Sequence, residues 1–176
     1  MNKKIALLAA VSVFALANSA NALEFKPYVG AQYNYTTVDN EYTEPKLNSG
    51  SVIIGTEYNK FFSTEVFYQL SDEDDDNGVS TDFAAYGLDA YASLPLGCDR
   101  VWSVFATAGI ANYDFDAKDV DGKFEDNGLG YRLGAGVQYN VTNNVAVRAL
   151  GRYIFADKLD NTDDMTEFSL GVKYTF

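Results

Sequence analysis

Large apolar residues alternate with small or polar residues along most of this chain. The pattern is clearest at the end, where every even position from Phe168 to Phe176 is large and apolar and every odd position is small or polar. A period of two predicts a β-strand with two unlike faces. Similar segments of about nine to eleven residues recur upstream, and this length matches a tilted strand crossing an outer membrane.

Eight such segments can be laid out, joined alternately by short turns and long polar stretches. The turns fall at 59–60, 95–100 and 142–144, and the long stretches at 36–49, 71–82, 114–127 and 156–165. This alternation is typical of outer-membrane barrels, whose short connections are periplasmic and whose long ones are external. The sequence therefore predicts an all-β fold, an eight-stranded antiparallel up-and-down transmembrane β-barrel.

Aromatic residues on the apolar face gather near the two ends of the predicted strands, with Ala, Val, Leu and Ile between them. They are Tyr58, Phe62, Trp102, Tyr139, Tyr174 and Phe176 beside the short turns, and Tyr35, Tyr68, Tyr86, Tyr131, Tyr153, Phe155 and Phe168 beside the long stretches. Two aromatic girdles around an aliphatic band are typical of a surface that faces a bilayer. A soluble barrel would instead hold its large apolar residues inside.

The first 22 residues have the pattern of a secretory signal peptide. Lys3 and Lys4 precede an apolar run over 5–17, and Ala20-Asn21-Ala22 is a small-x-small cleavage site. We expect cleavage after Ala22, which leaves 23–176 as one exported outer-membrane β-barrel domain.

Charge narrows the possible partners. Of the 13 Lys and Arg residues, Lys3 and Lys4 lie in the predicted signal peptide, so 11 bases face 25 acids in the remainder, a net charge of −14. This balance argues against nucleic acid as a partner and against docking on anionic lipid through a basic patch. The single cysteine, Cys98, excludes an intramolecular disulfide and falls in a predicted turn.

Charged residues recur on the predicted inward face. They are the acids Glu57, Glu65, Asp89 and Glu167 and the bases Arg132, Arg148, Arg152 and Lys173. An eight-stranded lumen is just wide enough for its side chains, and unpaired charges there are costly, so we expect ion pairs. Counting residues along each strand from its short-turn end places Arg148 nearest Glu57 and Glu65. The same count places Arg132 and Arg152 nearest Asp89 and Glu167. The network either plugs the barrel or gates a narrow pore.

Acidic residues dominate the long polar stretches, as in the run from Asp72 to Asp76. Such runs usually form a solvated, repulsive rim. Binding of divalent cations shared with lipid phosphates, or contact with basic or glycan partners, are the alternatives. Neither this run nor the acidic stretch 114–127 fits a calcium-binding loop. If Gly122 were the sixth residue of such a loop, its first residue would be Ala117 and its twelfth Gly128, and neither can be a ligand there. The run from Asp72 to Asp76 lacks the closing Glu. No metal or cofactor site is predicted.

Catalysis is not expected, because the chain contains no histidine to act as a general base and no Ser-x-x-Lys pattern. An Asp pair or Cys98 without a His partner is a poor substitute. The sequence predicts a protein that is not an enzyme.

The signal peptide, the eight segments and the closing stretch Leu170 to Phe176 resemble the small eight-stranded outer-membrane barrels of Gram-negative bacteria, the OmpA/OmpX-like and opacity-type (porin family) proteins. The stretch from Tyr139 to Tyr153 resembles the seventh-strand region of the OmpA transmembrane domain. The resemblance implies gating by an inward Glu–Arg pair. It also implies an assembly signal read by the barrel-assembly machinery through Leu170, Val172, Tyr174 and Phe176.

These features together predict a non-enzymatic surface protein of the cell outer membrane with a structural envelope role. The barrel serves as the anchor, and four acidic extracellular loops form an interaction surface. The alternative is a narrow gated porin-like channel for ions or very small solutes. The expected partners are outer-membrane lipid and lipopolysaccharide, the barrel-assembly machinery during biogenesis, and a host or envelope ligand at the loops. A monomer is expected.

Overall fold

The computed structural model describes residues 25–39, 46–71, 74–76, 79–97, 101–119, 122–157 and 164–176. The predicted signal peptide Met1–Ala22 and Cys98 lie outside these residues. Within them the chain forms nine strands. They are β1 (Lys26–Asp39), β2 (Lys46–Glu57), β3 (Phe62–Ser71), β4 (Asp74–Asp76), β5 (Val79–Leu96), β6 (Trp102–Asp119), β7 (Gly122–Asn140), β8 (Val145–Asp157) and β9 (Asp164–Thr175).

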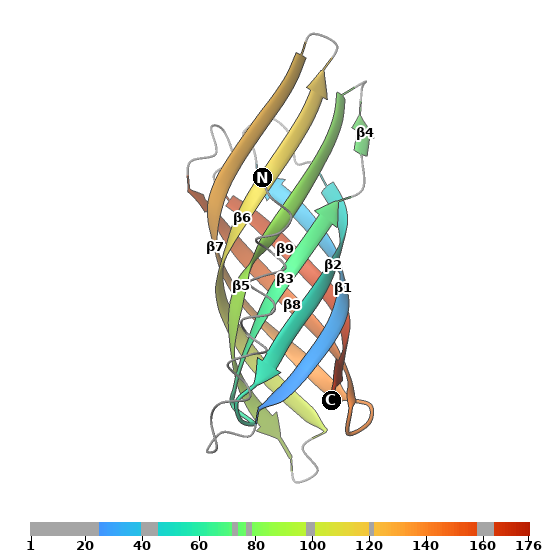
Figure 1. Cartoon of the computed structure of the whole chain (residues 1–176), viewed down its shortest axis with the longest axis vertical. Coiled ribbons are helices and arrows are strands. Elements are labelled where there is room, and N and C mark those ends of the chain that lie inside the picture. The colour runs from blue at the N-terminus through green and yellow to red at the C-terminus, as the bar shows by residue number, and fades with distance from the viewer. Residues whose placement is uncertain are drawn as a thin grey trace.

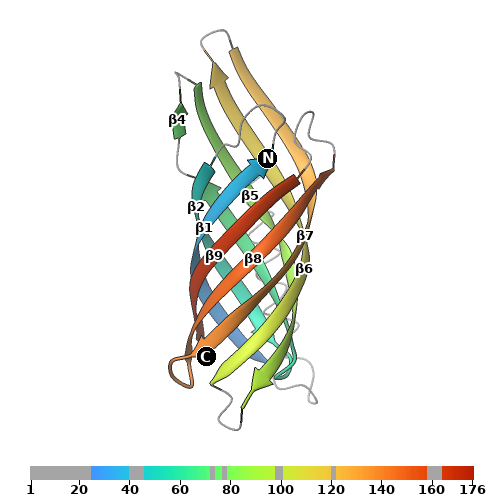
Figure 2. The ribbon, with the colours of Figure 1, turned by 180° about the vertical axis from the view of Figure 1, so that it is seen from behind.

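Eight of these strands close into an antiparallel barrel (Figures 1 and 2). The strand order is β3-β2-β1-β9-β8-β7-β6-β5, and pairing of β3 with β5 closes the ring. The short strand β4 pairs only with the outer end of β5. This architecture confirms the predicted fold class. No helix among the described residues is long and apolar enough to cross a membrane.

The outside of the barrel is apolar. Its exposed side chains include Leu133, Leu170 and Val172 in the middle of the strands, and aromatic residues near the ends. The rings of Trp102 and Tyr139 lie 4.7 Å apart at the short-turn end. Large apolar residues exposed around a whole barrel suit hydrocarbon rather than water, and the aromatic groups suit its two interfaces.

Seven of the eight barrel strands are longer than the predicted nine to eleven residues, and β3 alone stays within that range. Three of them are much longer than the others. β5, β6 and β7 have 18, 18 and 19 residues, and they rise above the rest of the barrel in Figure 1. The predicted loop 114–127 is a β-hairpin, paired from Asp114↔Asn127 to Asp119↔Gly122. The prediction of a loop over this range was wrong, because ladder hydrogen bonds join backbone groups and persist where the side chains become acidic.

Candidate functional site in the barrel lumen

All eight charged residues predicted to face inward lie in the lumen. Seven are buried, and Glu57 is half-buried near the short-turn end. The strands position them by parity, because alternate residues of each strand point to the same face. The charges fall into three levels along the barrel axis, named here the middle, lower and mouth levels from the long-loop end to the short-turn end.

The middle level holds two acids and two bases. Arg152 on β8 contacts Asp89 Oδ2 at 3.1 Å and Glu167 Oε1 at 2.8 Å. Arg132 on β7 lies 3.4 Å from Glu167 and 3.8 Å from Asp89, with its guanidinium 3.9 Å from the centre of the Phe67 ring. The four formal charges cancel, so this level is neutral and crosslinks four strands.

The lower level is built around Glu65 on β3. Arg148 Nη2 on β8 lies 2.7 Å from Glu65 Oε2 and 3.0 Å from Oε1. The hydroxyls of Tyr28 and Tyr91 donate to the same carboxylate at 3.0 and 2.6 Å. Glu65 therefore receives donors from β1, β5 and β8, which fixes its position in the lumen.

The mouth level is an ion pair between Lys173 on β9 and Glu57 on β2, with Nζ 2.6 Å from Oε1. The count along the strands placed Arg148 nearest both Glu57 and Glu65; Arg148 meets Glu65, but Glu57 pairs with Lys173 instead. The register of the barrel sets Lys173 beside Ala146, two residues before Arg148 on β8, and Lys173 is thus the base at the level of Glu57.

The two tyrosines and two further polar residues belong to this network, although the sequence did not single them out. Gln69 donates to Glu167 at 2.8 Å, and Ser169 donates to it at 3.3 Å. Tyr28 had a recognisable signal: it is an aromatic residue on an otherwise small and polar face, opposite Gly55 across the β1–β2 ladder. A Cβ at Gly55 would collide with the Tyr28 ring, so glycine there makes room for it.

Above the middle level the lumen is apolar. Five buried inward side chains form what we call the outer apolar cluster: Leu47, Phe83, Tyr113, Ile154 and Met165. The sequence did not single out these residues, because they lie within or next to the predicted long polar stretches or at the ends of the predicted strands. The alternation of inward and outward side chains could have placed these five residues in the lumen, because each lies on the same face of its strand as a charged or small inward residue. The lumen thus holds an apolar layer above its three charged levels.

The residues of the predicted assembly signal lie on the opposite face. Leu170, Val172, Tyr174 and Phe176 are exposed on the outside of β9 and at the C-terminus, and the Phe176 amide donates to the Pro27 carbonyl at 3.0 Å. Their reading by the assembly machinery stays a prediction. Among the described side chains, no group of three or more His, Cys, Asp or Glu is arranged to hold a metal ion.

A closed eight-stranded barrel with an apolar, aromatic-girdled exterior and a charged, side-chain-filled interior defines an outer-membrane barrel. The family model described as "Outer membrane protein beta-barrel domain" matches residues 6–176. The chain belongs to this family, whose members reside in the outer membrane of Gram-negative bacteria.

Solved structures of similar barrels agree with this assignment. Neisserial surface protein A matches with a TM-score of 0.74 and 19% identity, over 85% of this chain and 97% of that one. Ail, the attachment invasion locus protein of Yersinia pestis, matches with a TM-score of 0.66 and 18% identity, over 88% and 100%. The N-terminal barrel of Pseudomonas aeruginosa OprF matches at 0.58 and 20%, over 85% and 97%. At such identities the likeness concerns the fold. No curated protein matched the chain.

Proposed function

We propose that this protein is a non-enzymatic surface protein whose barrel anchors a projecting acidic sheet outside the outer membrane, where it contacts basic partners. The observation that carries the proposal is the unequal height of the barrel wall. The β6–β7 ladder runs on to Asp119↔Gly122, whereas the β7–β8 ladder stops at Leu129↔Asp157. On the other side β5 stays paired with β6 as far as Ser80↔Lys118, so β5, β6 and β7 together rise above β8. A paired sheet that projects in this way offers a defined surface for recognition.

Charge sets the kind of partner. The hairpin sequence from 114 to 126 contains six acids, Asp114, Asp116, Asp119, Asp121, Glu125 and Asp126, against two bases, Lys118 and Lys123. Such a surface attracts cationic partners and repels polyanions. One structure of Ail contains the heparin analogue sucrose octasulfate, which is a polyanion. The acidic hairpin of this chain supports the opposite preference.

The closed lumen supports placing the function outside the barrel. A conducting pore needs a continuous polar path, and here the outer apolar cluster lies above two layers of crosslinked charge. The sequence contains no histidine, the side chain that most often serves as a general base, and this supports the proposal of a non-enzymatic role.

The test replaces 116–125 by Asn-Gly, a two-residue turn that closes the hairpin at the paired residues Phe115 and Asp126. We expect the refolded truncated protein to keep its heat-shifted gel mobility and to lose binding to a polylysine surface. A second variant with Asp116, Asp119, Asp121 and Glu125 changed to Asn or Gln keeps the hairpin and isolates the charge. Equal binding by all three proteins would contradict the proposal.

A further inference from the structure

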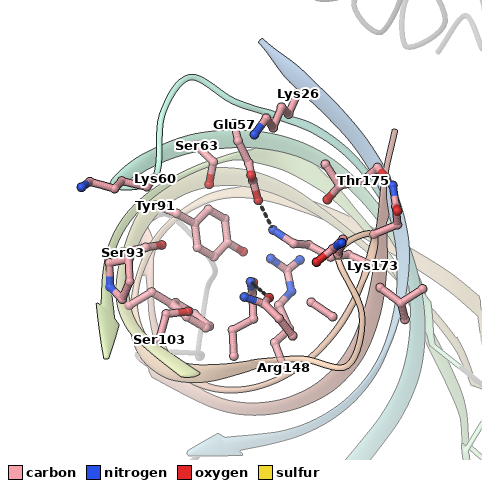
Figure 3. Close-up of a pocket in the computed structure, with 18 of the residues that line it drawn as sticks. Lys26, Glu57, Lys60, Ser63, Tyr91, Ser93, Ser103, Arg148, Lys173 and Thr175 are labelled. Carbon is pink, nitrogen blue, oxygen red and sulfur yellow. Dashed lines mark hydrogen bonds and ion pairs between the residues drawn. The ribbon is translucent and has the colours of Figure 1, made fainter. Parts of the chain in front are cut away.

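The barrel has a cavity at its short-turn end, below the lower level of charges. This vestibule has a volume of about 640 Å³ and is open at the mouth of the barrel. Figure 3 shows Arg148 and Lys173 inside the opening, and Tyr91 on the opposite wall. Arg148, which is paired with Glu65, lines the inner end of the vestibule, so the lower level of charges forms its floor. In an outer-membrane barrel the short turns face the periplasm, so the vestibule opens there.

Basic residues are concentrated in this one place. Lys26, Lys60, Arg148 and Lys173 line the vestibule, four of the 11 bases in a predicted mature chain whose net charge is −14. Glu57 is the one acid among its lining residues in the described part of the chain. The serine hydroxyls of Ser63 and Ser103 stand on the wall. Arg148 and Lys173 are paired with Glu65 and Glu57, but the bases still outnumber the acids when Glu65 at the floor is counted. Such an excess of positive charge attracts anions to the cavity.

Glu57 occupies the position that an anion would take. Its carboxylate contacts Lys173 Nζ at 2.6 Å, and its backbone pairs with Lys26 across the β1–β2 ladder. Its side chain is 27% exposed, whereas that of Lys173 is 6% exposed. The acid is therefore the more accessible partner of the pair, so a ligand oxyanion that enters from the mouth can take its place on Lys173.

We propose that the vestibule is a binding site for a small oxyanion from the periplasmic side, held by Lys26 and Lys173 with Arg148 at the floor. Phosphate and carboxylate groups share the required chemistry, since both accept several charge-assisted hydrogen bonds from ammonium and guanidinium donors. Lys60 stands at the rim and points away from the opening in Figure 3, so it adds charge rather than a contact. The site is separate from the external surface of the proposed function.

The experiment is calorimetric titration of the refolded mature protein in a non-ionic detergent at constant ionic strength. The two probes are inorganic phosphate and acetyl-dialanine, a peptide with a free carboxylate, and chloride is the ionic-strength control. We expect saturable binding of at least one probe, and the probe that binds more tightly identifies the source of the oxyanion. Absence of saturable binding for both probes overturns the proposal.

Three variants locate the site. Lys26→Gln removes an exposed base at the mouth and is expected to weaken binding roughly tenfold, the effect of one charge-assisted hydrogen bond. Glu57→Gln removes the competing carboxylate and is expected to strengthen binding. Lys46→Gln makes the same charge change at the far end of β2 and is expected to leave binding unchanged. An equal loss in Lys26→Gln and Lys46→Gln would show a diffuse charge effect and overturn the site. Because Lys26 is exposed, that comparison stands even if Glu57→Gln does not fold.

Discussion

Arg148 on β8 and Glu65 on β3 join opposite walls of the barrel, with Nη2 2.7 Å from Oε2. In the closed ring three strands separate β8 from β3 in either direction. The pair therefore spans the full width of the lumen. It ties together two walls that share no backbone hydrogen bonds, and it places a charged crosslink across any axial path.

Removal of either partner alone is expected to destabilise the barrel. Glu65→Ala or Arg148→Ala leaves an uncompensated buried charge, and such changes cost about 3–5 kcal/mol. The double variant Glu65→Gln with Arg148→Met removes both charges at similar volume and is expected to recover much of that loss. Urea unfolding followed by Trp102 fluorescence measures the free energies. Wild-type stability in both single variants would contradict the pairing.

Conductance tests whether this crosslink is a gate. We expect the refolded wild type to be silent in planar bilayers, because the outer apolar cluster closes the lumen above the charges. Arg148→Ala is expected to remain silent for the same reason. Heat-shifted gel mobility provides the folding control. Discrete openings that change with Glu65→Ala or Arg148→Ala would instead establish the gated channel.

Gly55 and Gly50 on β2 provide a matched pair of substitutions. A methyl group at Gly55 would meet the Tyr28 side chain, including its hydroxyl at 2.5 Å, whereas one at Gly50 would meet nothing within 4 Å. Gly55→Ala is expected to push the Tyr28 hydroxyl away from Glu65 and to cost about 1–3 kcal/mol. Gly50→Ala is expected to be close to neutral. Equal urea midpoints would show that the Tyr28 contact does not constrain β2.

Two exposed residues of the β7–β8 hairpin test where the bilayer begins. Leu133 is 52% exposed in the middle of β7, and Val141 is 53% exposed in the turn after it. In lipid vesicles we expect Leu133→Arg to cost about 2–4 kcal/mol and Val141→Arg about 0–1 kcal/mol, since the penalty for a charge depends on its depth. Similar costs at both positions would mean that Leu133 does not face hydrocarbon.

Much of this architecture was predictable from local pattern. Strand parity assigned Arg132, Arg148 and Arg152 to the inside and Leu133 to the outside, because successive side chains on a strand must point to opposite faces. The levels of Glu65, Asp89 and Glu167 relative to the arginines also followed from counting along the strands. The true length of β6 and β7 did not, since acidic composition is a poor guide to whether backbone groups are paired.

The sequence alone determined the faces of the barrel and the residues that carry its charge, because both depend on covalent order and a period of two. Only the tertiary structure decided the partner of Lys173 and the further donors to Glu65. Lys173 binds Glu57, and Arg148 is held by Glu65 with two tyrosines from other strands. Strand stagger around a closed barrel sets these heights, and it is a property of the whole ring that no single strand contains. The same closure brought Leu47, Phe83, Tyr113, Ile154 and Met165 together as an apolar layer over the charges.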